Sequence, residues 1–445
     1  MPESGGQKME NLELKPPASA EFSGIPRRRW GIALLLGFGV LVNYFDRVNL
    51  SVSQAALHAS FGISAITFGY LLSAYNWTYA ALQLPSGLIL DRFGIKLVGR
   101  VSTFLWSVAS FAAALSTGLP GFFGARFLLG IGEAPTFPAN SKATGYWFPT
   151  RERSMATALF DCSAKFSSAI GVPILGILMI HFGWRWSFAA TGFISLIYFF
   201  LFYAYYRNPS EDPGLSEVER KFILQHGAQP EDRVLAAKGA PFGYLLRQRK
   251  VWGLVLGYAS YNYTFYLLLT WLPSYLSSAL HIDLYHSVLY TSLPWFVATI
   301  AELLLGGWLV DHLVKKGFDD SRVRQIVLVG GTALGLGMLG AGYARTTTAA
   351  LFWITLAISG LSAASPVGWS IPSLIAPRES VGTLGGILNF GNQICGIAAP
   401  IITGYIYQFT HSFFWAFSVA AVFLAVGIVG YLSLLGRIEP IPEPS

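Results

Sequence analysis

Apolar runs of about 20 residues recur along the whole chain and dominate what it can fold into. A transmembrane α-helix needs about 20 consecutive apolar residues, because it must cross a hydrocarbon layer about 30 Å thick. Only 12% of the 445 residues are charged and 53% are hydrophobic, whereas a soluble domain carries about 25% charged residues. The pattern therefore predicts an all-α membrane protein that crosses the bilayer many times.

The runs divide the chain into two similar halves on either side of a polar stretch. Spans are expected at residues 30–53, 66–90, 97–117, 121–144, 154–179, 186–206, 250–278, 287–311, 324–344, 349–375, 380–407 and 411–435. The expected division is a disordered tail (1–26), an N-terminal six-helix bundle (27–206), a linker (207–249), a C-terminal six-helix bundle (250–436) and a second tail (437–445). The tail is rich in Pro, Ser and Gly and has no apolar period.

The basic residues indicate how the spans are oriented. The net charge is +7, but the positive charges gather in alternate loops instead of forming one patch. One set of loops carries Arg27–Arg29, Arg92, Lys96, Arg100, Arg151, Arg153, Lys315, Lys316, Arg322, Arg324, Arg378 and Arg437. The other set carries little beyond Arg185 and Arg345. The positive-inside rule places the first set, the linker and both tails in the cytoplasm of an inner (plasma) membrane protein, and it explains the basicity without nucleic acid.

Short identities between the halves indicate a duplicated unit. Arg151-Glu152 recurs as Arg378-Glu379, and Gly87-x-x-x-Asp91 recurs as Gly307-x-x-x-Asp311. Each match is short, but each falls at the same place in its half. This predicts two bundles related by pseudo-symmetry, with a binding site near the membrane midplane between them.

Charged residues inside an apolar span point to function. Arg126 and Glu133 lie seven residues apart in the fourth span, so they share one face of the helix about 10 Å apart along its axis. Ionisable groups in a lipid-buried helix are costly, and they usually line a substrate or proton path. The alternative is a structural charge that fastens one helix to its neighbour.

The motifs of other classes of protein are missing from the sequence. It contains no G-x-x-x-x-G-K-[ST] motif, so the protein is not a P-loop ATPase. Any transport would therefore be secondary, that is, not driven by ATP hydrolysis. It contains no H-E-x-x-H or G-x-S-x-G motif, and its two cysteines, Cys162 and Cys395, lie apart in apolar segments. We expect no enzyme, no metal site and no cofactor other than protons as coupling ion.

The chain resembles a known family over about residues 27 to 436, and motifs in three of its segments carry the resemblance. Gly87-x-x-x-Asp91-Arg92-x-Gly94, between spans two and three, resembles the loop signature of the major facilitator superfamily. Asp46-Arg47 in span one and Gly132-Glu133-Ala134-Pro135 in span four resemble its anion:cation symporter branch, which includes bacterial galactonate, hexuronate and glucarate carriers. The resemblance implies a monomer with this fold that takes up a small organic anion, most simply a sugar acid (an aldonate, hexuronate or aldarate), with protons by rocker-switch alternating access.

The resemblance also implies roles for the intramembrane charges. Arg47 would bind the substrate anion, and its planar guanidinium suits a carboxylate. Asp46 and Glu133 would take up protons, because a carboxyl buried away from water favours its neutral form and can exchange a proton near neutral pH. Arg126 completes this set, and an Asp46–Arg126 bridge that only holds two spans together is the structural alternative.

Two further charges depart from the pattern of the branch. Lys165 lies four residues after Asp161, so the two side chains can pair on one helix face. Alternatively, Lys165 points into the cavity as a second cation and would suit a substrate with two acidic ends. Glu302 in span eight is a further proton site, a substrate contact, or a neutral acid bonded to a hydroxyl group.

Other polar and aromatic residues complete the predicted sites. Hydroxyl and amide groups can read sugar hydroxyls, and aromatic rings can cover the apolar face of a sugar. The predicted substrate-binding residues are Arg47, Tyr44, Tyr79, Lys165, Trp369, Ser370, Asn389 and Asn262. The predicted proton-coupling residues are Asp46, Glu133, Arg126 and Glu302. The predicted gate charges, expected to form bridges when the carrier faces outward, are Asp91, Arg92, Arg151, Glu152, Asp311 and Arg378.

Two other functions remain open at this stage, an anion exchanger and a membrane sensor, and a multidrug exporter is disfavoured. An anion exchanger would swap metabolites without proton coupling, which the two buried acids argue against. A membrane sensor would need a signalling domain, and no loop is long enough for one. A multidrug exporter would need a wide acidic pocket, which the buried cations disfavour.

Overall fold

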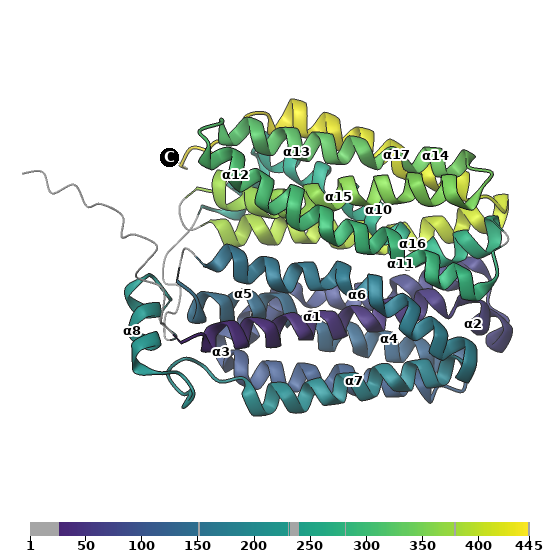
Figure 1. Ribbon diagram of the computed structural model, residues 1–445, viewed down its shortest axis with the longest axis horizontal. Helices are drawn as coiled ribbons and strands as arrows, with labels where there is room; N and C mark the ends of the chain where they lie inside the picture. Colours follow the sequence, from purple (N-terminus) through teal and green to yellow (C-terminus); the bar gives the residue numbers. More distant parts are fainter. Residues whose placement is uncertain are drawn as a thin grey trace, which may run out of the picture.

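The computed structural model describes residues 26–149, 152–229, 231, 240–280, 282–377 and 380–443. The described residues form helices and contain no strand. The helices run nearly along one direction and lie in two bundles, one built from the first half of the chain and the other from the second half (Figure 1). The all-α fold is confirmed. The expected tail of residues 1–26 lies outside the described residues, apart from Pro26.

The first half of the chain forms the N-terminal bundle, and a linker with two short helices follows. The bundle contains α1 (Arg28–Val52), α2 (Gln54–Phe61), α3 (Ala65–Ala114), α4 (Leu119–Glu133), α5 (Thr136–Trp147), α6 (Arg153–Phe182) and α7 (Trp184–Tyr205). The linker contains α8 (Glu217–Gln225) and α9 (Phe242–Leu246).

The second half forms the C-terminal bundle. It contains α10 (Arg249–Ala279), α11 (Leu284–Ala301), η2 (Glu302–Leu309), α12 (Val310–Lys315), α13 (Asp320–Gly335), α14 (Met338–Tyr343), α15 (Thr347–Ile375), α16 (Val381–Thr410), α17 (Phe413–Val429) and η3 (Gly430–Leu435). The η segments are π-helical turns within longer helices. The exact ends of the two bundles, at residues 206 and 250, stay predictions.

The membrane-spanning order agrees with the sequence pattern. Eight described helices are long and apolar enough to cross a membrane, and the bent pair of α2 with the first part of α3 makes nine. The three other expected spans correspond to α4 with α5, to α10 and to α16. These have the required length but carry more polar residues, many of which face the protein interior.

Spans four and eight differ from their expected form for local reasons, whereas spans two and three are two separate helices. Both belong to α3, and they meet at Gly94, whose φ of 74° is a conformation that favours glycine. Span four breaks after Glu133, because Pro135 cannot donate a backbone hydrogen bond to continue α4. Span eight continues past Ala301 through the π-helical η2 into α12.

The two ends of the molecule differ in the segments they carry. One end holds α8, the start of α1 and the end of the described chain, and we call it the α8 end (Figure 1). The opposite end holds α2, and we call it the α2 end. The bundles meet through α3 against α16, α6 against α11 and α1 against α10. At the α2 end they touch closely: a Cβ atom on Gly404 would lie 2.6 Å from the carbonyl oxygen of Ala65.

Candidate functional site

The centre of the N-terminal bundle contains an ion pair between Arg47 of α1 and Glu133, the last residue of α4. Arg47 donates through Nε (3.3 Å) and Nη2 (3.0 Å) to the same oxygen, Oε2 of Glu133. Arg47 Nη2 also donates to Oδ1 of Asn43, four residues earlier on the same helix face, at 2.8 Å. Both charged side chains are buried. The predicted anion-binding cation is therefore occupied by the protein's own carboxylate.

Three tyrosine rings surround the Arg47 guanidinium. Its Cζ lies 4.3 Å from the ring centre of Tyr44, 4.9 Å from Tyr75 and 5.4 Å from Tyr79. These cation–π contacts hold the charge in place while leaving its remaining N–H groups free to bond a carboxylate. The structure thus brings the predicted residues Tyr44 and Tyr79 to Arg47.

Asp46 faces away from its neighbour Arg47, as the turn of about 100° between adjacent helical residues requires. Its Oδ1 accepts a 2.6 Å hydrogen bond from Ser110 of α3, and its Oδ2 accepts a 3.5 Å bond from Ser195 of α7. Arg126 of α4 donates to the backbone carbonyl of Asp46 at 3.2 Å, and no ion pair joins the two side chains. The bridge considered as a structural alternative is therefore not formed in this conformation.

Lys165 of α6 lies between two carboxylates and is not free. Its Nζ is 3.4 Å from Oδ2 of Asp161 and 3.2 Å from Oε1 of Glu302, the first residue of η2. Lys165 thus pairs with Asp161, as one of the two expectations has it, and its role as a second cation for the substrate stays a prediction. Glu302 bonds an ammonium group and not a hydroxyl, since Lys165 reaches it across the contact between the bundles.

The other predicted binding residues lie at scattered places. Asn262 Nδ2 donates to the backbone carbonyl of Asn392 at 2.7 Å, so it fastens α10 to α16. Asn389 Nδ2 donates to Oε1 of Gln83 at 3.0 Å and thereby joins the two bundles. In the contacts described, neither amide meets Arg47 or Lys165.

Trp369 and Ser370 lie towards the α8 end of α15. The Trp369 ring is 41% exposed and packs edge-on against Tyr258, with 5.5 Å between ring centres. The Ser370 hydroxyl accepts a 2.9 Å bond from Arg324, which also pairs with Asp320. The sequence alone does not show this location. The helix α15 has 29 residues and reaches from one membrane surface to the other, and Ser370 falls in its second-to-last turn.

Two of the predicted gate charges that the structure describes, Asp91 and Glu152, make bridges within one bundle. Asp91 pairs with Lys142 at 2.6 Å, and Glu152 pairs with Arg29 at 2.7 Å. Asp311 is exposed at the α8 end, and Arg92 lies over the ring of Phe93.

The described gate charges therefore form no bridge between the bundles in this conformation. The predicted gate residues Arg151 and Arg378 lie outside the described residues.

Several residues of the site are not among those predicted. Asn43 bonds Arg47, Ser110 bonds Asp46, and Gln83 bonds Asn389. The sequence could have identified Asn43, because it lies four residues before Arg47 on the same helix. It could not have identified Ser110, because serines in membrane helices commonly bond the carbonyl four residues earlier, as Ser110 also does with Trp106.

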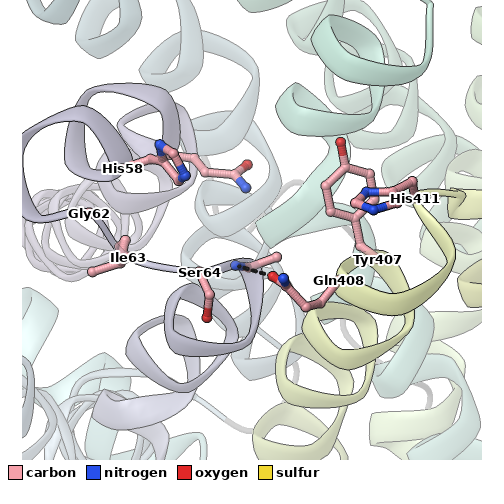
Figure 2. Close-up of a pocket in the computed structure, with 9 residues that line it drawn as sticks. His58, Gly62, Ile63, Ser64, Tyr407, Gln408 and His411 are labelled. Carbon is pink, nitrogen blue, oxygen red and sulfur yellow. Dashed lines mark hydrogen bonds between the residues drawn. The ribbon is translucent and has the colours of Figure 1, made fainter.

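The larger of the two described cavities lies away from these charges, at the α2 end. It has a volume of about 430 Å³ and is lined from both bundles. Figure 2 shows His58 on one wall and His411 on the opposite wall, with Gln408 between them accepting a hydrogen bond from the Ala65 N–H. The charged centre itself is filled by its own side chains, with Arg47, Glu133, Lys165 and Glu302 all buried.

Comparison with known proteins shows the family to which this architecture belongs. Residues 36–318 match the Major Facilitator Superfamily. An uncharacterized transporter, YybO, of Bacillus subtilis is 39% identical over 93% of this chain and 95% of its own. A probable galactarate/D-glucarate transporter, GarP, of Escherichia coli K12 is 32% identical over 92% and 95%. A D-galactonate transporter of Escherichia coli O6:H1 is 31% identical over 93% and 97%.

A solved structure shares the fold. A bacterial homologue of the human lysosomal transporter Spinster, in an inward-facing and occupied conformation, superposes with a TM-score of 0.73 at 16% identity. The match covers 92% of this chain and 97% of that one. At this identity the likeness concerns the fold alone, and it agrees with the two-bundle arrangement of Figure 1.

Proposed function

The chain belongs to the Major Facilitator Superfamily, a family of transporters and not of enzymes, and we propose that it takes up a sugar acid together with protons. The matched relatives bear the names of galactarate, glucarate and galactonate, which are all sugar acids. The transported ligand is accordingly a small polyhydroxylated carboxylate, and no cofactor other than the proton takes part.

The Arg47–Glu133 pair is the observation that carries this proposal. Arg47 is buried, is bordered by three tyrosines, and bonds one carboxylate, that of Glu133. A substrate carboxylate binds the same guanidinium only when Glu133 gives it up. A buried glutamate that loses its cation is strongly destabilised as an anion, so it takes a proton as the substrate binds.

An oxygen of Glu133 that has no hydrogen-bond partner also supports the replacement of Glu133 by a substrate carboxylate on Arg47. Oε2 bonds Arg47, whereas Oε1 is buried without a hydrogen-bond partner. A buried polar atom without a partner is costly, and a proton on the carboxyl relieves the negative charge at this place. Asp46, held by Ser110 and Ser195, is a second acid that takes up a proton.

The location of the basic residues supports the orientation. Arg28, Arg29, Lys96 and Arg100 lie at the α8 end, where Lys96 pairs with Glu211 of the linker. By the positive-inside rule, we assign this end and both termini to the cytoplasm of an inner membrane. The bundles would then rock about the central charges, opening the site to either side in turn. The carrier works as a monomer in this scheme.

Uptake by purified protein in liposomes tests the proposal. Labelled galactarate, glucarate and galactonate are offered with and without an inward proton gradient, for the parent, for Glu133→Gln and for the exposed-site control Glu439→Gln. We expect accumulation of at least one acid against its gradient by the parent and the control. Glu133→Gln should lose this accumulation but keep exchange of internal for external substrate. Accumulation that ignores both the gradient and the variant would refute proton coupling.

A further inference from the structure

A second ion pair in the interior repeats the design of the Arg47–Glu133 pair. Lys165 is a buried cation bonded to one oxygen of a buried acid, Glu302. Oε2 of Glu302 is buried without a hydrogen-bond partner, as Oε1 of Glu133 is. In both pairs the acid therefore uses one oxygen on the cation and leaves the other free to hold a proton.

The second pair lies between the bundles. Lys165 belongs to α6 of the N-terminal bundle, and Glu302 begins η2 of the C-terminal bundle. Among the ion pairs of the described residues, this is the one that joins the bundles. Major facilitator sites lie at this interface near the midplane, so the position is suitable for binding a ligand.

Tyr44 connects the two cations. Its ring lies 4.3 Å from Cζ of Arg47, and its hydroxyl lies within electrostatic reach of both Arg47 and Lys165. Tyr44 is therefore a neighbour of both cations.

The surroundings of the Lys165–Glu302 pair are mostly buried. The other charged and titratable groups near the pair are Asp161 and Cys162 of α6 and Tyr258 and Tyr261 of α10. The side chains of Lys165 and Glu302 are each 5% exposed, whereas that of Asp161 is 20% exposed. Asp161 is therefore more accessible than the pair it borders.

The backbone at Glu302 is also unusual. Glu302 is the first residue of an eight-residue π-helical segment inside a spanning helix. Such segments are rare, and where they occur they are often found at functional sites. Glu302 bonds Lys165 at the start of this segment.

We propose that Lys165 and Glu302 form a second carboxylate site, so that the preferred substrate is a dicarboxylic sugar acid whose two ends bind Arg47 and Lys165. This rests on the uptake function proposed above and names its substrate class. The second carboxylate replaces Glu302 on Lys165, and Glu302 takes a proton at its free oxygen. Each substrate carboxylate brings one proton in this way, and the charge of the site stays constant through binding.

The experiment compares two sugar acids of equal length, glucarate with two carboxylates and gluconate with one. Initial rates of labelled substrate and of proton entry are measured in liposomes for the parent and for the double variant Lys165→Gln/Glu302→Gln, which leaves no lone charge of that pair buried. The matched control is Lys250→Gln/Glu439→Gln, which neutralises a Lys–Glu pair of 3.3 Å at the α8 end.

We expect the parent and the control to favour glucarate and to carry one more proton with each glucarate than with each gluconate. The double variant should lose glucarate kcat/KM at least about tenfold more than gluconate kcat/KM, as expected when a buried charge contact is removed from only one ligand. The difference in protons per substrate should vanish. The milder variant Glu302→Gln, which leaves Lys165 paired with Asp161, should keep glucarate uptake and lose only the extra proton.

Equal losses for both acids in the double variant would overturn the proposal, because a pair that only fastens the bundles together serves every substrate alike. A parent that prefers gluconate, with equal proton counts for the two acids, would overturn it as well and leave sugar-acid uptake standing. A parent that accumulates neither these acids nor galactonate under a proton gradient would refute the uptake function itself.

Discussion

The hydroxyl groups of Tyr75 in α3 and Tyr266 in α10 lie 2.9 Å apart, so a hydrogen bond joins the two bundles directly beside Arg47. Tyr75 contacts the guanidinium of Arg47 with its ring and the opposite bundle with its hydroxyl. One side chain therefore touches both the central cation and the contact between the bundles.

Tyr266→Phe tests this connection. The loss of a buried hydrogen bond of about 1 kcal/mol changes an equilibrium about fivefold, and we expect it to favour conformations in which the α2 end is open. Spin labels at Ala59 and Thr410, in a protein with Cys162 and Cys395 replaced by Ser, report the separation at that end. A longer average distance is expected. An unchanged distance distribution would show that the bond does not affect the equilibrium between conformations.

Asp46→Asn and Glu133→Gln should affect substrate affinity differently. Glu133 occupies Arg47, so its neutralisation frees the guanidinium, and we expect roughly tenfold tighter binding of the sugar acid at neutral pH. Asp46 bonds Ser110 and does not contact Arg47, so Asp46→Asn should change affinity less than about threefold. Isothermal titration of both variants measures this. Equal tightening by both would contradict the division of roles.

Arg47→Lys should weaken binding even though it keeps the charge. Arg47 bonds Glu133 and Asn43 through two different nitrogen atoms, a fork that a single ammonium group cannot reproduce. We expect KM for the sugar acid to rise about tenfold or more, since the loss is at least about 1.4 kcal/mol. Arg437→Lys, at a side chain that is 70% exposed, is the control and should transport as the parent does.

Gly404→Ala should disturb the closed α2 end. The added Cβ would lie 2.6 Å from the backbone carbonyl of Ala65, and backbone cannot move aside as a flexible side chain can. We expect a loss of about 1–3 kcal/mol in the stability of this conformation and a lower Tm. Gly385→Ala on the same helix, where nothing lies within 4 Å of the new atom, is the comparison. Equal Tm values for the two variants would contradict the close packing.

Arg29→Ala should loosen α8 from the N-terminal bundle. Arg29 bonds the fully buried carboxylate of Glu219 at 2.8 Å and that of Glu152 at 2.7 Å. Removing one partner of a buried pair leaves an uncompensated charge and costs about 3–5 kcal/mol. Faster proteolytic cleavage within the linker is expected. Lys221→Ala, at an exposed position of α8, should be cleaved at the parent's rate.

The sequence predicts the spanning helices well, because a long run of apolar residues in a membrane protein forms a transmembrane helix. It also predicts that Arg47 and Glu133 share the interior, because such charges have few stable locations there. It does not predict that Lys165 reaches Glu302, since 137 residues separate them and helix periodicity says nothing of contacts between bundles. It does not predict the bond between Arg324 and Ser370 either, because the depth of Ser370 along α15 depends on where the helix begins.

The internal pairing of Arg47 also bears on the return of the unloaded carrier. A guanidinium left bare in the dry interior would make reorientation of the empty protein very slow, and such a carrier turns over only by trading one solute for another. In this conformation Glu133 is the counter-ion of Arg47, so the Arg47 guanidinium is not left bare. Under the proposed mechanism, the protein can therefore reorient without a bound solute, and uptake needs no solute to be exported in exchange.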